Sequence, residues 1–318
     1  MQVVIPDALP APAVARDLAR LLPERAPTLL AWMRAAAARV ERIDPATEGC
    51  TPFEAWQLRQ AGFRPDAGQP LGAGMGPLHA GERRTGEPGQ PVWVAELSHV
   101  ALGTDHASLL DPEALVLDPD EGTELFRAAA PLFEGTGFHA GVLTPRRWQI
   151  GLPRDMVPRT VTPQAVAGRA IDAWWPQQDS LRPWRRLLNE IQMVWHDHPV
   201  NRARAERGDP PVNSLWLYGG ARPWPAPAAR ASAPRIFGAL HGAACAGDWN
   251  AWLDALARLD REALRPLAAR LPGSEPALTL TLTGRERLAT LDLRRRHRLL
   301  AWLPRPDKNW NAWWNLPD

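Results

Sequence analysis

The segment HPVNRARAERGDPPVNSLWLYGG, residues 198–220, brings polar, aromatic and glycine residues into one short span. Ahead of it, apolar side chains recur at the spacing of one helix face over residues 182–198. Pro199 ends this predicted helix, because a proline disfavours helical backbone in the residue before it. The chain therefore changes direction at the start of the segment.

Two shorter elements follow this turn. Asn201 is placed to cap a second helix, RARAER, and Gly208 is placed to close it, since glycine readily adopts the left-handed backbone that ends helices. The apolar residues within 212–218 then predict a strand, which a glycine pair turns away. The segment as a whole predicts a unit of helix, turn, helix and strand.

Polar side chains gather at the joint of this unit. An imidazole, a guanidinium and amides at a helix terminus suit an anion such as a phosphate or a carboxylate. An internal polar network that pins the helix to the sheet is the alternative, and both interpretations remain open. The candidate anion- or ligand-binding residues are His198, Asn201, Arg202, Asn213 and Ser214.

Helical and strand patterns alternate along the rest of the chain, which indicates an α/β protein. A buried strand at residues 2–5 is expected to end at Pro6. Residues 64–90 are so rich in glycine and proline that we expect an extended loop there. We expect a single domain over residues 1–318, with a small inserted subdomain at about 91–160 preceded by that loop.

Local signals predict several element ends. Residues 13–40 carry a helical pattern that prolines interrupt. Asp118 is placed to cap a helix with Pro119 at its first position. Thr144 and Pro145 are expected to turn a pair of strands.

Composition bounds the class of protein. A hydrophobic fraction of 45% over 318 residues is sufficient for a substantial core. The formal net charge of +2 lacks the basic excess of a nucleic-acid-binding protein. The sequence contains no run of the roughly 20 apolar residues that a membrane-spanning helix needs. Cys50 and Cys245 form neither a CxxC motif nor a disulfide framework, so we expect a cytoplasmic protein without a membrane partner.

The residues of the opening segment carry a resemblance to a known family. HPVNRARAERGDPPVNSLW resembles the HPxNxxR segment of the archaeal-type cofactor-independent phosphoglycerate mutases, which belong to the alkaline phosphatase superfamily. Read with the residues around it, from about 165 to 225, the chain is still more similar to the RpfE-type regulatory proteins of proteobacteria. The resemblance implies a reduced alkaline-phosphatase-like sandwich, with a mixed sheet flanked by helices.

The resemblance also implies a metal chemistry to look for. Enzymes of that superfamily hold two divalent metals with aspartate and histidine ligands, and a serine or threonine hydroxyl attacks the phosphoryl group. Asp7 matches the first metal-binding aspartate. Ala8 and Pro10–Ala11 replace the glycine and the second aspartate of the family's DGLGD pattern. His241 and His297 stand apart from other ligands in the sequence, so we expect a decayed metal site, with Asp7 as its remnant, and no cofactor.

A separate group of residues could offer metal ligands from a strand and the loop after it. Solvated side chains are the alternative interpretation, and the one we favour. The group consists of His99, Asp105, His106 and Asp111.

The function expected from these observations is a non-catalytic regulatory or binding protein derived from a phosphoglycerate-mutase-like ancestor. Its partner would be another protein or a small phosphorylated metabolite. An active metal-dependent phosphoryl-transfer enzyme is one alternative. A weak nucleic-acid binder is another, because residues 294–298 (RRRHR) precede Trp310, Trp313 and Trp314, which could stack on bases. The helical spacing of these tryptophans favours burial in a core instead.

Overall fold

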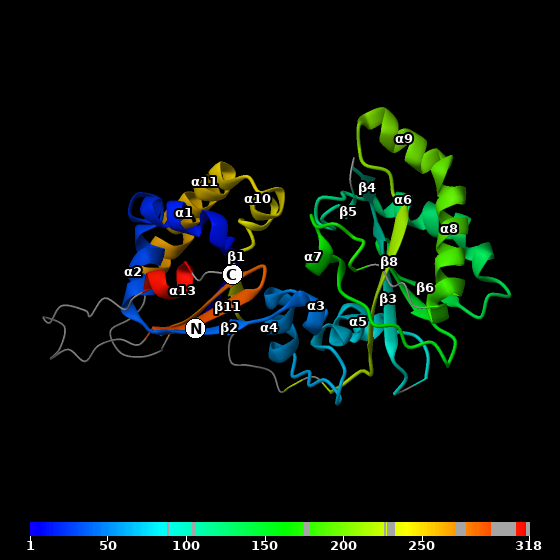
Figure 1. The fold of residues 1–318 in the computed structure, drawn as a ribbon, viewed down its shortest axis with the longest axis horizontal. Coiled ribbons are helices and arrows are strands. Elements are labelled where there is room, and N and C mark those ends of the chain that lie inside the picture. Colours follow the sequence, from blue (N-terminus) through cyan, green and yellow to red (C-terminus); the bar gives the residue numbers. More distant parts are fainter. Residues whose placement is uncertain are drawn as a thin grey trace, which may run out of the picture. The chain divides into compact units, whose positions relative to one another are not determined.

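A computed structural model describes residues 1–87, 89–103, 106–174, 179–225, 227, 233–270, 278–293 and 310–315. The chain forms two compact units, each of mixed α/β structure with helices beside its main sheet (Figure 1). Unit 1 comprises Met1–Ile43 together with Ala228–Asp318, and unit 2 is the intervening stretch Asp44–Pro227. This is the α/β class that the sequence predicts.

A mixed sheet forms the centre of unit 1. Its strands are β1 (Gln2–Leu9), β2 (Ala38–Arg42), β9 (Arg235–Ile236), β10 (Leu278–Gly284) and β11 (Arg287–Leu293). They lie in the order β2-β11-β10-β1-β9. β1 runs parallel to β10 and β9, whereas β10, β11 and β2 are antiparallel neighbours.

The first strand extends beyond its expected end at Pro6 and reaches Leu9. The pairing of β1 with β10 is irregular between Ile5 and Leu9, where proline has no N–H to donate. Within this irregular part Asp7 takes a left-handed backbone conformation, with φ of 56°. The strand therefore continues past the proline at the cost of a local distortion that centres on Asp7.

The helical stretch expected at residues 13–40 divides into two helices and a strand. Pro27 begins the second helix, where a missing N–H costs nothing, while Pro23 lies in the last turn of the first without ending it. The last residues of the stretch belong to β2 rather than to a helix. The helices of unit 1 are α1 (Pro12–Arg25), α2 (Pro27–Ala35), α10 (His241–Ala246), α11 (Trp249–Leu259), a π-helical turn (Asp260–Leu264), α12 (Arg265–Arg270) and α13 (Trp310–Trp314).

The C-terminal tryptophans pack into the core of unit 1. Trp310 and Trp314 are 4% and 0% exposed, and Trp313 packs against the same cluster. The Trp314 indole N–H donates to the carbonyl oxygen of Ala15 at 3.1 Å. The predicted burial of this aromatic tail is confirmed, whereas the basic run at 294–298 lies outside the described residues.

An antiparallel sheet in the order β6-β7-β3-β8 forms the centre of unit 2. Its strands are β3 (Val92–Ser98), β6 (His139–Thr144), β7 (Arg147–Gly151) and β8 (Ser214–Ala221), and a separate hairpin joins β4 (Val100–Leu102) to β5 (Ala107–Leu109). The α-helices are α3 (Pro45–Glu48), α4 (Pro52–Gln60), α5 (Met75–Ala80), α6 (Pro119–Ala129), α7 (Pro163–Val166), α8 (Arg182–His196) and α9 (Pro199–Arg207). Short 3-10 turns occupy Leu71–Gly74, Gly81–Arg83, Ala130–Phe133 and Asp179–Leu181.

One face of this sheet is apolar and the other carries polar groups. Alternate residues of β3, β7 and β8, such as Trp93, Trp148 and Leu215, belong to an apolar cluster with α6 and α8. Glu96, Arg147 and other paired residues lie on the opposite face, because successive side chains of a strand alternate. The sheet thus separates a conventional core from a buried polar layer.

Several local predictions in unit 2 are confirmed. Asp118 caps α6 through a capping box, with Pro119 at the first helical position. Thr144 ends β6, and Pro145 follows it in the turn that leads to β7. Gly208 closes α9 in the left-handed conformation, with φ of 77°.

The prediction of an extended loop at residues 64–90 is wrong for the central part of this stretch. That part forms a 3-10 turn, α5 and a second 3-10 turn. A Cβ atom on Gly72 would lie 2.2 Å from the Gly49 carbonyl oxygen, and one on Gly76 would lie 2.2 Å from that of Val92. The glycines therefore allow buried backbone segments to approach closely. Glycine density here reflects packing, not an extended loop.

The limits of unit 2 differ from the insertion expected at about 91–160. β3 pairs with both β7 and β8, and Glu96 lies opposite Arg147 on one side and Trp216 on the other. Residues on either side of 160 therefore share one sheet.

In the part of the chain that the structure describes, no helix combines the length and the apolar character needed to cross a bilayer.

Candidate functional site

The joint between α8 and α9 is formed by residues 197 and 198. His198, not Asn201, is the N-cap of α9, and its Nδ1 accepts a hydrogen bond from the Val200 N–H at 3.3 Å. Pro199 supplies the first helical residue, so the helix begins two residues earlier than Asn201. The predicted capping role of Asn201 is wrong because the His-Pro pair already starts the helix.

Asn201 instead joins three backbone segments. Its side-chain Nδ2 donates to the carbonyl oxygens of Trp195 and Val212, each at 2.8 Å. Its Oδ1 accepts from the N–H of Val212, also at 2.8 Å. Asn201 is 5% exposed, so these bonds lie in a low-dielectric interior. The amide ties the end of α8 to the segment that enters β8.

Asn213 makes a comparable connection to β4. Its Oδ1 accepts from the N–H of Val100 at 2.7 Å, and its Nδ2 donates to the Val100 carbonyl oxygen at 2.9 Å. The side chain of Gln192 on α8 donates to the Asn213 carbonyl oxygen at 2.9 Å. Both asparagine side chains therefore hydrogen-bond to backbone groups and hold neighbouring segments together. This is the role expected if the polar residues form an internal network that pins the helix to the sheet.

The other three predicted residues have less determined roles. Arg202 is exposed, whereas Ser214 is fully buried and its Oγ has no hydrogen-bond partner within the described residues. Burial lowers the pKa of His198, which favours the neutral form of its ring. Binding of an anion by these residues stays a prediction.

A buried arginine beside the predicted set holds the charge of this region. Arg204 is 1% exposed, and it donates from Nε to the Pro210 carbonyl oxygen at 2.8 Å and from its guanidinium to Glu121 on α6. Arg207 donates to the same carboxylate. Although burial opposes ionisation, these hydrogen bonds hold the pKa of Glu121 below its usual value. Glu121 lies 83 residues before Arg204, and no pattern in the sequence indicates that the two side chains pair.

The second predicted site centres on Asp7, at the end of β1. Its Oδ2 lies 2.7 Å from Nδ1 of His241, the first residue of α10. Its carbonyl oxygen accepts from the indole N–H of Trp252 on α11 at 2.9 Å. The sequence placed His241 apart from other ligands, and the structure corrects this by bringing it to Asp7.

Cys245 lies next to this pair. It is four residues after His241 on α10, and its Sγ lies 3.7 Å from Nε2 and 3.8 Å from Nδ1 of the ring. Asp7 and His241 have side chains that are 20% exposed, and Cys245 is partly buried. Carboxylate, imidazole and thiol thus meet where solvent can reach them.

A buried polar network in unit 2 had no counterpart in the sequence predictions. Glu96 accepts from Arg147 Nε at 2.9 Å and from the Tyr218 hydroxyl at 3.4 Å, and that hydroxyl lies 2.7 Å from Nδ1 of His79. Burial lowers the pKa of His79 to about 3 and raises that of Tyr218 well above its usual value. Both groups are therefore neutral at physiological pH, and the network joins the polar face of the sheet to α5.

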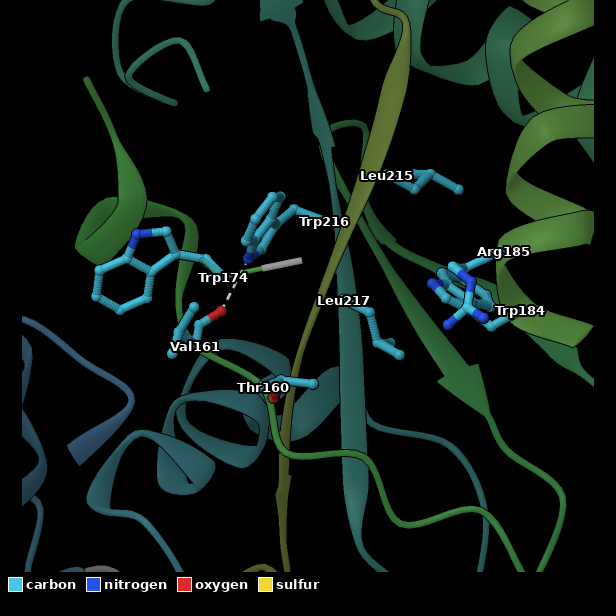
Figure 2. Close-up of a pocket in the computed structure, with 8 residues that line it drawn as sticks. All are labelled: Thr160, Val161, Trp174, Trp184, Arg185, Leu215, Trp216 and Leu217. Carbon is cyan, nitrogen blue, oxygen red and sulfur yellow. Dashed lines mark hydrogen bonds between the residues drawn. The ribbon is translucent and has the colours of Figure 1, made fainter. Parts of the chain in front are cut away.

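A small pocket lies beside β8 in the same unit. Figure 2 shows Trp174 and Trp216 on one side of the strand, and Trp184 and Arg185 on the other. The Trp216 indole N–H donates to the Val161 carbonyl oxygen at 2.8 Å. The cavity of about 20 Å³ has room for about one water molecule. It is too small, as it stands, for a phosphorylated metabolite.

The weaker candidate group of metal ligands is only partly described. Nδ1 of His99 lies 2.8 Å from the carbonyl oxygen of Pro211. The Asp111 carboxylate accepts from the Glu113 N–H at 3.1 Å, as a turn cap. His106 is exposed, and Asp105 lies outside the described residues. The favoured interpretation of this group as solvated side chains, rather than metal ligands, stays a prediction.

Comparisons with known proteins identify a distant similarity to phosphoglycerate mutases. No family model matches the chain. The chain is 36% identical over 59 residues, 19% of its length, to the probable 2,3-bisphosphoglycerate-independent phosphoglycerate mutase of Geobacter sulfurreducens. It is 26% identical over 100 residues, 31% of its length, to the 2,3-bisphosphoglycerate-independent phosphoglycerate mutase of Methanothrix thermoacetophila. These matches span 15% and 25% of the two relatives.

Solved structures also align with most of the chain. One is the cofactor-independent phosphoglycerate mutase from Thermoplasma acidophilum, which aligns with 98% of this chain and 94% of its own at 15% identity and a TM-score of 0.38. The sequence matches show that the chain is distantly similar to cofactor-independent phosphoglycerate mutases.

Proposed function

We propose that this chain is a non-catalytic regulatory or binding protein that descends from a phosphoglycerate-mutase-like ancestor. The distant similarity to two mutases supports the ancestry. The RpfE-type regulatory proteins, which the sequence resembles over residues 165–225, are the group in which we place it. Its partner would be another protein or a small phosphorylated metabolite.

The surroundings of Asp7 support the loss of phosphoryl-transfer chemistry. A two-metal centre needs carboxylates and imidazoles that point at the metals, with a hydroxyl nucleophile between them. Here the positions after Asp7 are Ala8, Leu9 and Pro10, which are buried apolar residues without ligand atoms. The Asp7 carboxylate is hydrogen-bonded to His241. This single observation carries the proposal, because the Asp7 carboxylate is engaged by an imidazole and the strand supplies no second aspartate or hydroxyl directly after it.

The alternative of nucleic-acid binding has less support. Base stacking needs exposed aromatic faces. Trp310 and Trp314 are buried in the core of unit 1 and cannot offer such faces without unfolding of the tail. The nearly balanced charge of the chain also lacks the basic excess that phosphate contacts require.

An activity assay tests the proposal. The purified full-length chain should not interconvert 2- and 3-phosphoglycerate with added manganese, cobalt or zinc, under conditions in which an active cofactor-independent mutase does. Metal-dependent turnover that is lost in Asp7→Ala would restore the enzyme alternative. Asp17→Ala is the matched control, because Asp17 is an exposed carboxylate paired with Arg20 on the surface of α1.

A binding assay tests the positive half of the proposal. Thermal unfolding would be followed with 3-phosphoglycerate, inorganic phosphate and buffer alone, since a ligand of the folded state raises the melting temperature. We expect a concentration-dependent increase with the phosphorylated compounds if the partner is a metabolite. If neither compound raised the melting temperature, both would be excluded as ligands. The proposal would then require a protein partner.

A further inference from the structure

The cluster of Asp7, His241 and Cys245 has a geometry that capping and packing do not explain. His241 and Cys245 lie four residues apart on α10, so their side chains project from the same helix face. Asp7 approaches from the end of β1 and takes Nδ1 of the ring. The three side chains come from two elements of unit 1, β1 and α10, and are all partly exposed to solvent.

The backbone at Asp7 is strained in a way that serves this contact. A non-glycine residue with φ of 56° is uncommon, and such a conformation persists only where the surroundings hold it in place. Trp252 holds the Asp7 carbonyl oxygen, and the Asp7 N–H donates to the Thr283 hydroxyl at 3.4 Å. An observed outlier of this kind, next to a thiol and an imidazole, points to a functional constraint.

We propose that His241 and Cys245 form a binding site for a soft transition-metal ion of the zinc type, with Asp7 as the residue that orients His241. Thiolate and imidazole are the ligands that zinc prefers. Zinc-binding histidines commonly donate their other ring N–H to a carboxylate, which fixes the tautomer and the ring orientation. Asp7 occupies that position at Nδ1, and Nε2 is the ring atom that would bind the metal.

The two ligand atoms lie close enough to share an ion once the Cys245 side chain rotates. Bonds of about 2.3 Å to sulfur and about 2.0 Å to nitrogen at a tetrahedral angle place these atoms about 3.5 Å apart. Sγ and Nε2 are 3.7 Å apart. Because Sγ is almost equally distant from both ring nitrogens, it lies over the ring, and metal entry requires a rotation of Cys245 about its Cα–Cβ bond. Solvent or a further ligand would complete the coordination.

This site differs from the decayed two-metal centre. The superfamily resemblance makes Asp7 a direct ligand to a metal that serves phosphoryl transfer, whereas here Asp7 acts through His241. It also departs from the expectation of a protein without a cofactor. Zinc binding without mutase turnover is consistent with both proposals. Mutase turnover would contradict the proposed function, but the metal site would still be tested separately by the binding experiments below.

Cobalt(II) substitution tests the site on the full-length chain. Cobalt bound by a thiolate gives a near-ultraviolet charge-transfer absorption, which cobalt bound by oxygen and nitrogen lacks. We expect this absorption in the wild type and its loss in Cys245→Ser and in His241→Ala. Asp7→Asn should keep the absorption and weaken zinc affinity about 10- to 100-fold, as measured by competition with a chromophoric chelator.

The other cysteine is the matched control. Cys50 is fully buried in unit 2, and burial raises its pKa well above the usual range for a thiol, so Cys50→Ala should leave the absorption unchanged. Circular dichroism of each variant checks that the fold is retained. Zinc should also protect Cys245 from alkylation by iodoacetamide. The proposal would be overturned if the cobalt complex lacked the charge-transfer absorption, or if the absorption persisted in Cys245→Ser. Fast alkylation of Cys245 that zinc does not slow would indicate a reactive thiol instead of a metal ligand.

Discussion

Asn201→Ala is the substitution that separates the structural role of the α8–α9 joint from a binding role. The change removes three hydrogen bonds of 2.8 Å, which the side chain makes with Trp195 and Val212. Each buried bond contributes about 1 kcal/mol, so the expected loss in the free energy of unfolding is about 3 kcal/mol. The loss could be larger, because the N–H of Val212 would remain buried without its acceptor.

Urea unfolding, followed by tryptophan fluorescence and by circular dichroism, measures this loss. Arg202→Ala is the matched control, since it changes an exposed neighbour on the same helix and should alter stability by less than about 0.5 kcal/mol. Asn201→Asp keeps the acceptor for Val212 but loses both donors, and it should destabilise at least as much as the alanine. A loss below about 0.5 kcal/mol for Asn201→Ala, together with loss of a phosphate-dependent melting shift, would refute the structural role and support anion binding.

The remaining predictions concern the tail, the polar network and the buried ion pair. Trp314→Ala should cost about 3–5 kcal/mol in calorimetric unfolding, and Trp313→Ala, which changes a partly buried ring, should cost less; equal and negligible effects would contradict the packed tail. Burial lowers the pKa of His79 to about 3, so the unfolded state binds more protons below about pH 6.5 and stability falls as the pH decreases through that range. This residue should account for a loss of up to about 2 kcal/mol between pH 7 and pH 5, and His79→Gln should reduce that loss; an unchanged pH dependence would argue against a neutral buried ring. Arg204→Ala should cost about 3 kcal/mol or more because it removes one partner of a buried pair, whereas Arg207→Ala, which changes a half-exposed residue, should cost clearly less in the same urea assay, and the reverse order would contradict the assignment.

The elements that the sequence predicts well are those whose causes are local. Asp118 and Pro119 start α6 because the capping oxygen and the missing N–H act within one helical turn. Gly208 ends α9 because its own backbone can adopt positive φ. The burial of Trp310 and Trp314 follows from their spacing on one short helix.

The candidate site is predicted only in part, because its contacts join residues that are distant in the sequence. The sequence identifies the joint and most of its polar residues, yet it assigns Asn201 to a cap. The partners of that amide, Trp195 and Val212, are six and eleven residues away, and only the fold brings them together. Gly72 shows the same limit, since the backbone it approaches, at Gly49, belongs to another segment.

The sequence by itself determined the α/β class, several helix ends, such as those at Asp118 and Gly208, and the apolar faces, because these depend on interactions between residues a few positions apart. Only the tertiary structure placed Asp7 against His241, which is 234 residues away, and β3 between β7 and β8. A hydrogen bond or a metal site depends on positions fixed to within a fraction of an ångström. Such positions follow from strand register and helix packing over the whole unit, so the residues that share a site carry no common signal in the linear chain.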